Sequence, residues 1–147
     1  MPERKNLLLI FDGHALVHRA FHALPALAVT KTGEPTGALY GFATMLLKVL
    51  AEYKPTHWAI ALDAPGRTFR HEQFEEYKAH RKPAPDELKS QLVRVRELIK
   101  AFHAPSFEIP GYEADDIIGT ISKKASEQGI DTIIVTGDTD TLQLVSP

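Results

Sequence analysis

Acidic residues recur in this sequence where short apolar segments end. Asp12 follows the segment Leu7–Phe11, and Asp63 follows the segment Trp58–Leu62. Two further segments, Phe107–Ile109 and Thr132–Val135, are followed by Glu113, Asp115 and Asp116, and by Asp138 and Asp140, respectively. In an open parallel sheet, ligands bind in the crevice beyond the carboxyl ends of the strands. If the four segments are parallel strands, seven carboxylates therefore converge on one crevice.

A cluster of this kind favours the binding of divalent metal ions. One aspartate after a strand is commonly the N-cap of the next helix. Here the pattern repeats at every strand end, and Glu113, Asp115 and Asp116 exceed what one cap needs. Neighbouring carboxylates raise one another's pKa values and need a counterion, and Mg²⁺ or Mn²⁺ prefers such oxygen ligands. Two ions about 3.5–4 Å apart can activate water and stabilise the leaving oxygen of a phosphodiester. We therefore predict a two-metal site for phosphodiester hydrolysis.

The segment Ala64–Lys82 has no clean periodicity and is predicted to be an excursion from the edge of the sheet. It carries cations interleaved with aromatic residues: Arg67, Arg70, Lys78, Arg81 and Lys82 among Phe69, Phe74 and Tyr77. Cations beside an acidic metal site can hold a phosphate that the carboxylates would repel. On a helix, Lys78 and Arg81 would face the same way. The alternative interpretation is a solvated amphipathic helix with exposed charges.

Other chemistries find little support. The sequence has no cysteine, which excludes disulfides, thiolate zinc sites and a cysteine nucleophile. It has no P-loop, dinucleotide-binding or G-x-S-x-G motif. His14, His18 and His22 recur every four residues, and we expect buried or surface histidines there in preference to metal ligands. Gly137 is predicted to permit a tight turn that aims Asp138 and Asp140 inward.

The elements that must position these residues alternate along the chain. Apolar stripes at helical spacing predict helices over Phe42–Tyr53, over Leu88–Phe102 after Pro83–Pro85, and over Ile117–Ala125 with an end at Gly129. Strands that alternate with helices predict an α/β fold with a parallel sheet covered on both faces. The 147 residues, 44% of them hydrophobic, fit one domain with a net charge of −2. No apolar run is long enough to cross a bilayer and no signal-peptide cleavage site follows the N-terminus, so we expect a cytoplasmic protein.

Several blocks together resemble a known family. They are Phe11-Asp12-Gly13-His14, Phe69-Arg70-His71-Glu72, Tyr77-Lys78-Ala79-His80-Arg81, Pro110-Gly111-Tyr112-Glu113-Ala114-Asp115-Asp116, Thr136-Gly137-Asp138-Thr139-Asp140 and Leu142-Gln143-Leu144. In this order they resemble the 5′-nuclease domains of bacterial DNA polymerases I, members of the flap-endonuclease family. The resemblance runs along nearly the whole chain. It implies a PIN-like, resolvase-like fold with a helical arch at about residues 64–82, and a site with two Mg²⁺ or Mn²⁺ ions.

The resemblance also implies roles for individual residues. The first metal ion would be held by Asp12, Asp63, Glu113 and Asp115. Asp115 would bridge to a second ion held partly by Asp138 and Asp140, with Asp116 nearby. Lys78 and Arg81 would lie in the arch and steer the scissile phosphate, and Arg70 would contact a phosphate. At the position of His18 the family has a tyrosine that stacks on the base beside the cut; an imidazole stacks less extensively.

The implied activity is structure-specific cleavage of DNA at 5′ flaps and 5′ ends, as in removing RNA primers from DNA hybrids during replication and repair. The family continues with further aspartates for the second ion, a helix-three-turn-helix element and a polymerase domain. We expect none of these within residues 1–147, which would then be the N-terminal catalytic part of a longer polymerase I chain.

Other functions remain open from the sequence. A PIN-type ribonuclease would share the acidic crevice but should prefer RNA and has less need of the basic excursion. A non-catalytic fragment would bind branched DNA without cutting it. A haloacid-dehalogenase phosphatase would need a second aspartate where this chain has His14, so that class is set aside.

Overall fold

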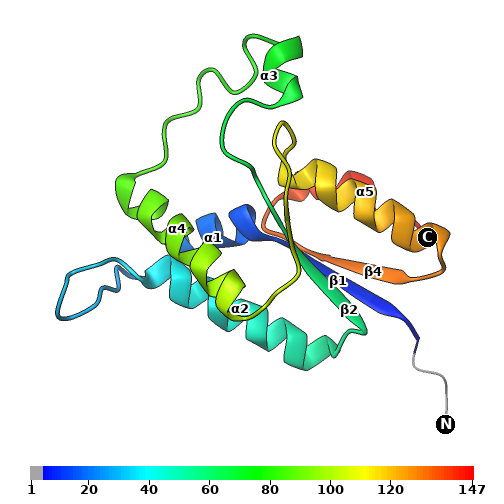
Figure 1. Cartoon of the computed structure of the whole chain (residues 1–147), viewed down its shortest axis with the longest axis horizontal. Coiled ribbons are helices and arrows are strands. Elements are labelled where there is room, and N and C mark those ends of the chain that lie inside the picture. The colour runs from blue at the N-terminus through cyan, green and yellow to red at the C-terminus, as the bar shows by residue number, and fades with distance from the viewer. Residues whose placement is uncertain (1–4) are drawn as a thin grey trace.

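Four parallel strands form the centre of the fold. The computed structural model describes residues 5–147. The strands are β1 (Leu7–Asp12), β2 (His57–Leu62), β3 (Ser106–Glu108) and β4 (Asp131–Val135), in the order β3-β2-β1-β4 (Figure 1). All three pairings are parallel, with Leu9 opposite Trp58 on one side and Ile133 on the other. The predicted parallel sheet is confirmed, and each predicted strand lies within one residue of its observed bounds.

Helices cover both faces of this sheet. They are α1 (Gly13–Ala23), α2 (Gly37–Tyr53), α3 (Phe69–Gln73), α4 (Asp86–Ala101) and α5 (Ala114–Glu127), and a 3-10 helix, η1, spans Thr139–Leu144. Helices α1, α2 and α4 lie on one side of the sheet and α5 lies on the other (Figure 1). In residues 5–147, no helix is long and apolar enough to cross a membrane.

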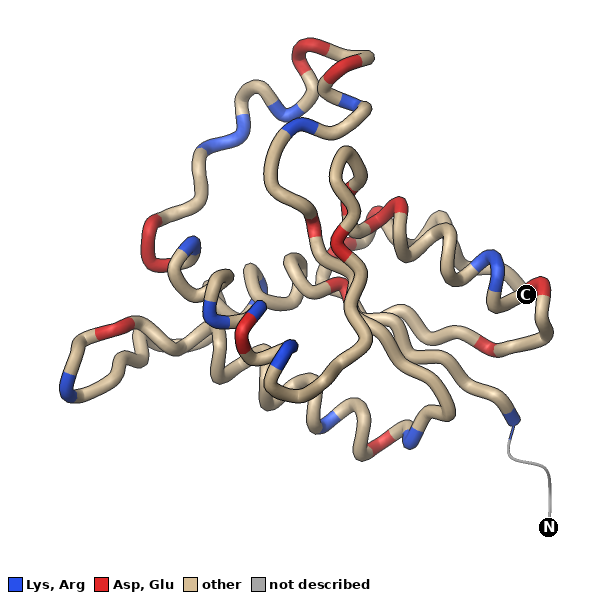
Figure 2. Tube along the Cα trace, viewed as in Figure 1, with Lys and Arg blue, Asp and Glu red and all other residues tan. Residues whose placement is uncertain are grey.

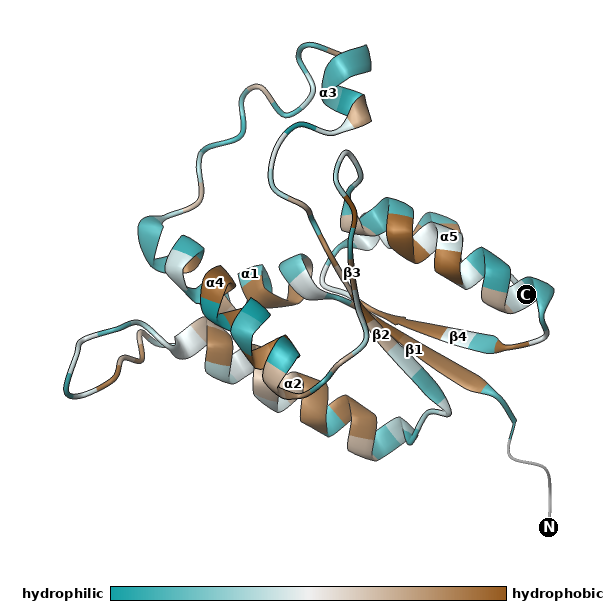
Figure 3. Ribbon diagram, in the orientation of Figure 1, coloured by the Kyte–Doolittle hydropathy of each residue, from teal (hydrophilic) through white to brown (hydrophobic). Residues whose placement is uncertain are grey.

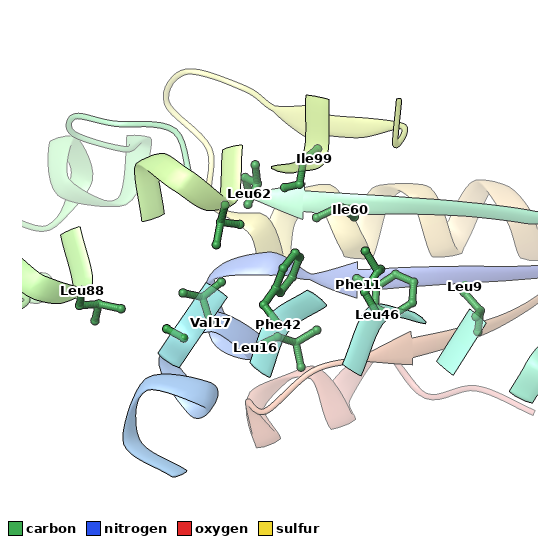
Figure 4. Close-up of a cluster of buried hydrophobic side chains, with 12 residues drawn as sticks. Leu9, Phe11, Leu16, Val17, Phe42, Leu46, Ile60, Leu62, Leu88 and Ile99 are labelled. Carbon is green, nitrogen blue, oxygen red and sulfur yellow. The ribbon is translucent and has the colours of Figure 1, made fainter. Parts of the chain in front are cut away.

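Strand β1 is buried on both faces, and its alternating side chains contribute to two cores. Leu9 and Phe11 pack against Phe42, Leu46 and neighbouring residues of the α1, α2 and α4 layer (Figure 4). Ile10 points the other way, toward Ile117 and Ile118 of α5. Each fully buried side chain of this size contributes about 1.5–3 kcal/mol relative to an exposed one. These cores fix the strand ends, and therefore the residues that follow them.

The excursion leaves β2 and returns at α4, and it differs from the predicted helical arch. Figure 1 shows it projecting away from the sheet, and Figure 3 shows that it is largely hydrophilic. Its one helix, α3, has five residues, and the rest of residues 64–82 forms turns and irregular chain. Lys78 has a φ of 56°, in the left-handed region. On a helix Lys78 and Arg81 would face the same way, but the chain is not helical there.

A buried glutamine caps α2 from another helix. The residue before α2, Thr36, makes no side-chain cap. Instead, Oε1 of Gln91, a residue of α4 with 2% exposure, accepts the Ala38 N–H at 2.7 Å and the Leu39 N–H at 3.2 Å. The first N–H groups of a helix have no partner within the helix, so Gln91 satisfies two of them. It also joins α2 to α4 beneath the excursion.

We predict that Gln91→Met lowers the free energy of unfolding by about 1–3 kcal/mol, because two N–H groups of α2 lose a buried acceptor. Urea unfolding followed by circular dichroism measures the change. Gln128→Met, at the exposed end of α5, is the matched control and should leave the midpoint unchanged. Equal midpoints for wild type and Gln91→Met would contradict this role.

Candidate functional site

The predicted acidic crevice forms at the carboxyl ends of the strands. Figure 2 shows acidic segments gathered there, and both basic and acidic segments along the excursion. The charges of Asp12, Asp63, Glu113 and Asp138 all act on Asp115, which lies in the first turn of α5. Asp140 lines a pocket of about 480 Å³ together with Glu113 and Asp115. The structure therefore brings together carboxylates from four separate segments of the chain, as the sequence predicts.

Asp12 is the most buried carboxylate of the site, with 3% exposure. Its Oδ1 accepts the Ala15 N–H at 3.1 Å, so it is the N-cap of α1, and its Oδ2 accepts the Thr136 hydroxyl at 2.9 Å. Thr136 also accepts the Asp138 N–H at 3.0 Å and so links the ends of β1 and β4. Burial raises the pKa of Asp12, against the lowering effect of these hydrogen bonds.

Asp63 lies beside the start of α5. Its Oδ1 accepts the Ala114 N–H at 2.6 Å, and the positive end of the helix dipole favours a carboxylate there. The His14 ring accepts the Asp63 N–H through Nδ1 at 3.0 Å. Burial lowers the pKa of His14, which keeps the ring neutral and able to accept.

Two groups of the excursion contact Glu113. Lys78 donates from Nζ to Oε1 at 3.0 Å, and the Tyr77 hydroxyl donates to Oε2 at 3.2 Å. Burial lowers the pKa of Lys78, whereas the hydrogen bond to Glu113 and the charge of that carboxylate raise it. The two raising effects together outweigh burial, so the pKa of Lys78 is above its ordinary value. Gly111, with a φ of 85°, makes the turn that precedes Glu113.

A bidentate ion pair joins α3 of the excursion to α5. Arg70 donates to the two carboxylate oxygens of Asp116 at 2.7 and 2.6 Å, and its Nη1 lies 3.8 Å from Oε2 of Glu113. The Arg70 hydrogen bonds hold the pKa of Asp116 below its usual value. Asp116 also accepts the Glu113 N–H at 3.0 Å. In this conformation Asp116 and Arg70 engage each other, and their predicted contacts with metal and phosphate stay predictions.

Asp115 has no such compensation. Burial, followed by the charges of Asp12, Asp138, Asp63 and Glu113, raises its pKa to about 6. No hydrogen bond to its carboxylate occurs in residues 5–147, in contrast to the neighbouring Asp116. Asp115 is therefore the group at which the mutual repulsion of the carboxylates is concentrated.

The last strand positions Asp138 and Asp140 by way of η1. Asp138 is the N-cap of η1, and its Oδ1 accepts the Asp140 N–H at 2.9 Å. The chain bends at Gly137, as predicted, but its φ is not positive. A Cβ added to Gly137 would make ordinary van der Waals contact with the Ala15 carbonyl oxygen and the Arg19 side chain of α1, both at 3.5 Å.

The predicted DNA contacts lie on both sides of the crevice. His18 is half-buried on α1, and Arg81 is an exposed residue of the excursion. Burial and then the charge of Arg81 lower the pKa of His18, which places the two residues near each other. Lys78 and Arg70 contact the carboxylates directly. The excursion thus brings Arg70 and Lys78 to the carboxylates and Arg81 near His18.

The carboxylate oxygens are suitable ligands for hard divalent cations, but in this conformation they do not converge on one coordination site within the part of the chain that the structure describes. The carboxylates supply the oxygen ligands that Mg²⁺ and Mn²⁺ prefer, and Asp12 and Asp115 have raised pKa values in the absence of a cation. No group of three or more His, Asp or Glu side chains in residues 5–147 is arranged so that it could hold a metal ion. Lys78 and Arg70 occupy Glu113 and Asp116 instead. The predicted ligand set stays a prediction.

Sequence reasoning missed several residues that shape the site. Thr136 and Tyr77 lie inside blocks that carry the family resemblance, so their positions gave a signal but their partners did not. His14 belongs to a histidine series that gave no ligand assignment, and only the packing of α1 on β2 shows its contact with Asp63.

An acidic crevice at the carboxyl ends of a parallel sheet, beneath a basic excursion, defines a nuclease-like α/β domain of the resolvase-like class. The family model for the 5′–3′ exonuclease N-terminal resolvase-like domain matches residues 7–147, and this chain belongs to that family. Among curated relatives, DNA polymerase I of Chloroflexus aurantiacus is 50% identical over 141 residues, and that of Bacillus subtilis is 47% identical over 146. These alignments cover 95% and 99% of this chain but only 15% and 16% of the relatives.

Solved structures share the fold. A bacteriophage T5 5′-exonuclease with bound zinc ions superposes with a TM-score of 0.75 and 22% identity, over 96% of this chain and 52% of that one. A T5 D15 flap endonuclease in a pseudo-enzyme-product complex with DNA and metal ions gives a TM-score of 0.76 and 21% identity. Its alignment has the same coverage of 96% and 52%. The predicted resolvase-like fold and the family are thereby confirmed.

We predict that Asp115→Asn stabilises the metal-free protein at pH 7. Because the pKa of Asp115 in the folded state, about 6, exceeds the ordinary value of 3.8, its protonation favours folding at low pH. This contribution is lost as pH rises through about 6. Asp115→Asn should therefore raise the free energy of unfolding by about 1–2 kcal/mol at pH 7, after allowance for solvent screening, and have little effect near pH 4. Urea unfolding in chelator measures both, with exposed Asp131→Asn as the control.

We predict that Lys78→Met tightens the binding of Mn²⁺ about 3- to 10-fold, because a cation no longer has to be displaced from Glu113. Isothermal titration calorimetry measures the affinity. Lys82→Met is the control, because it removes an equal charge from an exposed position of the excursion. Comparing the two variants distinguishes the effect of the direct Lys78–Glu113 contact from the long-range effect of losing one positive charge. If the two variants change the affinity equally, the contact between Lys78 and Glu113 does not compete with the metal.

Proposed function

We propose that this chain is the catalytic part of a divalent-metal-dependent, structure-specific 5′ nuclease that hydrolyses DNA phosphodiesters at 5′ flaps and 5′ ends. The observation that carries the proposal is the acidic crevice with the cations of one excursion above it. Membership in the 5′–3′ exonuclease domain family supports the reaction class. The T5 complex with DNA and metal ions, which shares the fold, supports the type of substrate.

The carboxylates have distinct proposed roles. Asp12, Asp63, Glu113 and Asp115 would hold the first of two Mg²⁺ or Mn²⁺ ions. The second would take Asp115 as a shared ligand, together with Asp138 and Asp140, and Asp116 would lie beside them. When bound, such ions lower the pKa of water and stabilise the leaving oxygen. Burial and then the charges of Asp12, Asp138, Asp63 and Glu113 raise the pKa of Asp115, and a bound cation would offset both effects, which supports Asp115 as a metal ligand.

The excursion and α1 would bind the nucleic acid. Lys78 and Arg81 would hold the phosphate to be cut, and Arg70 would contact a neighbouring phosphate once Asp116 releases it. His18, which faces Arg81 from α1, would stack on the base beside the cut. The reaction would add water across the P–O bond and leave a phosphate on one fragment and a hydroxyl on the other. RNA primers paired with DNA are also proposed substrates, and the remainder of a polymerase I chain is the proposed covalent partner.

The test is cleavage of an end-labelled 5′-flap DNA by residues 1–147 in Mg²⁺ or Mn²⁺. We predict cutting near the flap junction that Asp115→Asn reduces at least about 100-fold, because a metal ligand is lost. Asp131→Asn, at the opposite end of β4, is the matched control and should cut normally.

Other outcomes distinguish the alternatives. Preferential cutting of unstructured RNA of the same sequence would support a PIN-type ribonuclease. Binding of the flap DNA without cutting by any variant would support a non-catalytic fragment. Equal cutting by wild type and Asp115→Asn would show that the acidic crevice is not the active site.

A further inference from the structure

Asp63 is held by more contacts than its proposed role as a metal ligand requires. It is the first residue after β2, and from it the chain runs directly into the excursion (Figure 1). His14 accepts its N–H at 3.0 Å, and Arg96 of α4 donates from Nη2 to its carbonyl oxygen at 3.3 Å. Its Oδ1 accepts the Ala114 N–H at 2.6 Å. Within residues 5–147, this leaves Oδ2 as its one polar atom without a hydrogen bond.

The contact of His14 depends on a close approach of α1 to β2. A Cβ added to Gly13 would lie 2.5 Å from Cδ2 of Leu62 and 3.1 Å from the Ala61 carbonyl oxygen. The first turn of α1 therefore lies directly against the end of β2, and no larger residue fits at position 13 without movement. The next residue along α1, His14, is thereby brought within hydrogen-bond distance of Asp63, 49 residues away in the sequence.

Arg96 joins three elements at the same point. Its Nη1 donates to the Leu92 carbonyl oxygen of α4 at 3.4 Å, and its Nε and Nη2 donate to the Glu108 carboxylate at 3.0–3.3 Å. Glu108 is on β3, opposite Leu62 of β2. The planar guanidinium has five donors in a fixed geometry, so one side chain can serve α4, β3 and the residue after β2.

We propose that His14 and Arg96 are positioning residues, which fix the main chain of Asp63 so that its free carboxylate oxygen stays directed at the metal site. Because they hold the main chain of Asp63, the excursion that follows it can change its own contacts without displacing this proposed metal ligand. The inference rests on the proposed function only in taking Asp63 as a metal ligand. Neither residue touches substrate or metal in this role.

The test uses the geometry of the acceptor. In His14→Asn, the side-chain oxygen takes the place of Nδ1, whereas His14→Leu has no acceptor. We expect His14→Leu to raise the hydrogen-exchange rate of the Asp63 amide at least about 10-fold and to weaken Mn²⁺ binding roughly 10- to 100-fold. His14→Asn should restore both to within about 3-fold of wild type. Arg96→Met should weaken Mn²⁺ binding in the same direction.

Matched controls separate positioning from general destabilisation. His22→Leu removes a histidine from the same helix, and Arg94→Met removes an exposed arginine from α4; both should leave the Asp63 amide and Mn²⁺ affinity unchanged. Urea unfolding ranks all variants by stability.

An unchanged Asp63 amide in folded His14→Leu would overturn the inference, as would equal losses in His14→Asn and His14→Leu. The exchange measurement does not depend on metal. If the wild type neither binds Mn²⁺ nor cuts flap DNA, the proposed function fails. If the Asp63 amide still responds as expected in that case, His14 and Arg96 fix the Asp63 main chain but do not serve a metal site.

Discussion

Carboxylates at the ends of parallel strands repel one another, and much of the surrounding structure serves to offset that repulsion. Asp12 has two hydrogen-bond donors, one from the main chain of α1 and one from Thr136. Asp63 receives an N–H group at the start of α5, and Glu113 receives the ammonium of Lys78. Asp115 has none of these, and its pKa is raised accordingly. A divalent cation bound in the crevice would therefore reduce the repulsion between carboxylates that the hydrogen bonds offset only in part.

The excursion connects this electrostatic problem to substrate binding. Its cations Arg70 and Lys78 are paired with Asp116 and Glu113, the acids nearest to it. The same charges are the ones proposed to hold phosphates. If a cation binds Glu113 as proposed, it would displace Lys78 from that carboxylate and leave the ammonium group available to a phosphate. The contacts of His14 and Arg96 with the Asp63 main chain would keep one proposed ligand in place during such a change.

Much of this site could be predicted from the sequence, and the reason is geometric. Strand ends are visible in the pattern of apolar residues, and parallel strands bring their carboxyl ends to one edge, so Asp12, Asp63 and Asp138 were expected to meet. The excursion was visible as an interruption of this pattern. Its internal conformation was not, because the left-handed backbone at Lys78 and the contact of its side chain with Glu113, 35 residues away, leave no local sequence pattern.

Contacts between distant side chains were also beyond sequence reasoning. Nothing in the spacing of His14 or Arg96 shows that both contact residue 63, since those contacts depend on how α1 and α4 pack. The sequence gives no sign that Gln91 caps another helix, because its contact with the first N–H groups of α2 depends on how α2 and α4 pack. The predicted turn at Gly137 is seen as a bend after β4, but the contact of this bend with α1 could not be read from the sequence.

The position of β1 between β2 and β4 has a consequence for the timing of synthesis. The hydrogen bond from Thr136 to Asp12 joins residues 124 positions apart, so β1 gains β4 as a neighbour only after that much more chain has been synthesised. At typical translation rates, about 6–25 s separate the synthesis of these two residues. During that time a nascent chain has no β4 and an incomplete crevice. The acidic crevice is therefore assembled only after Thr136 and Asp138 have been synthesised.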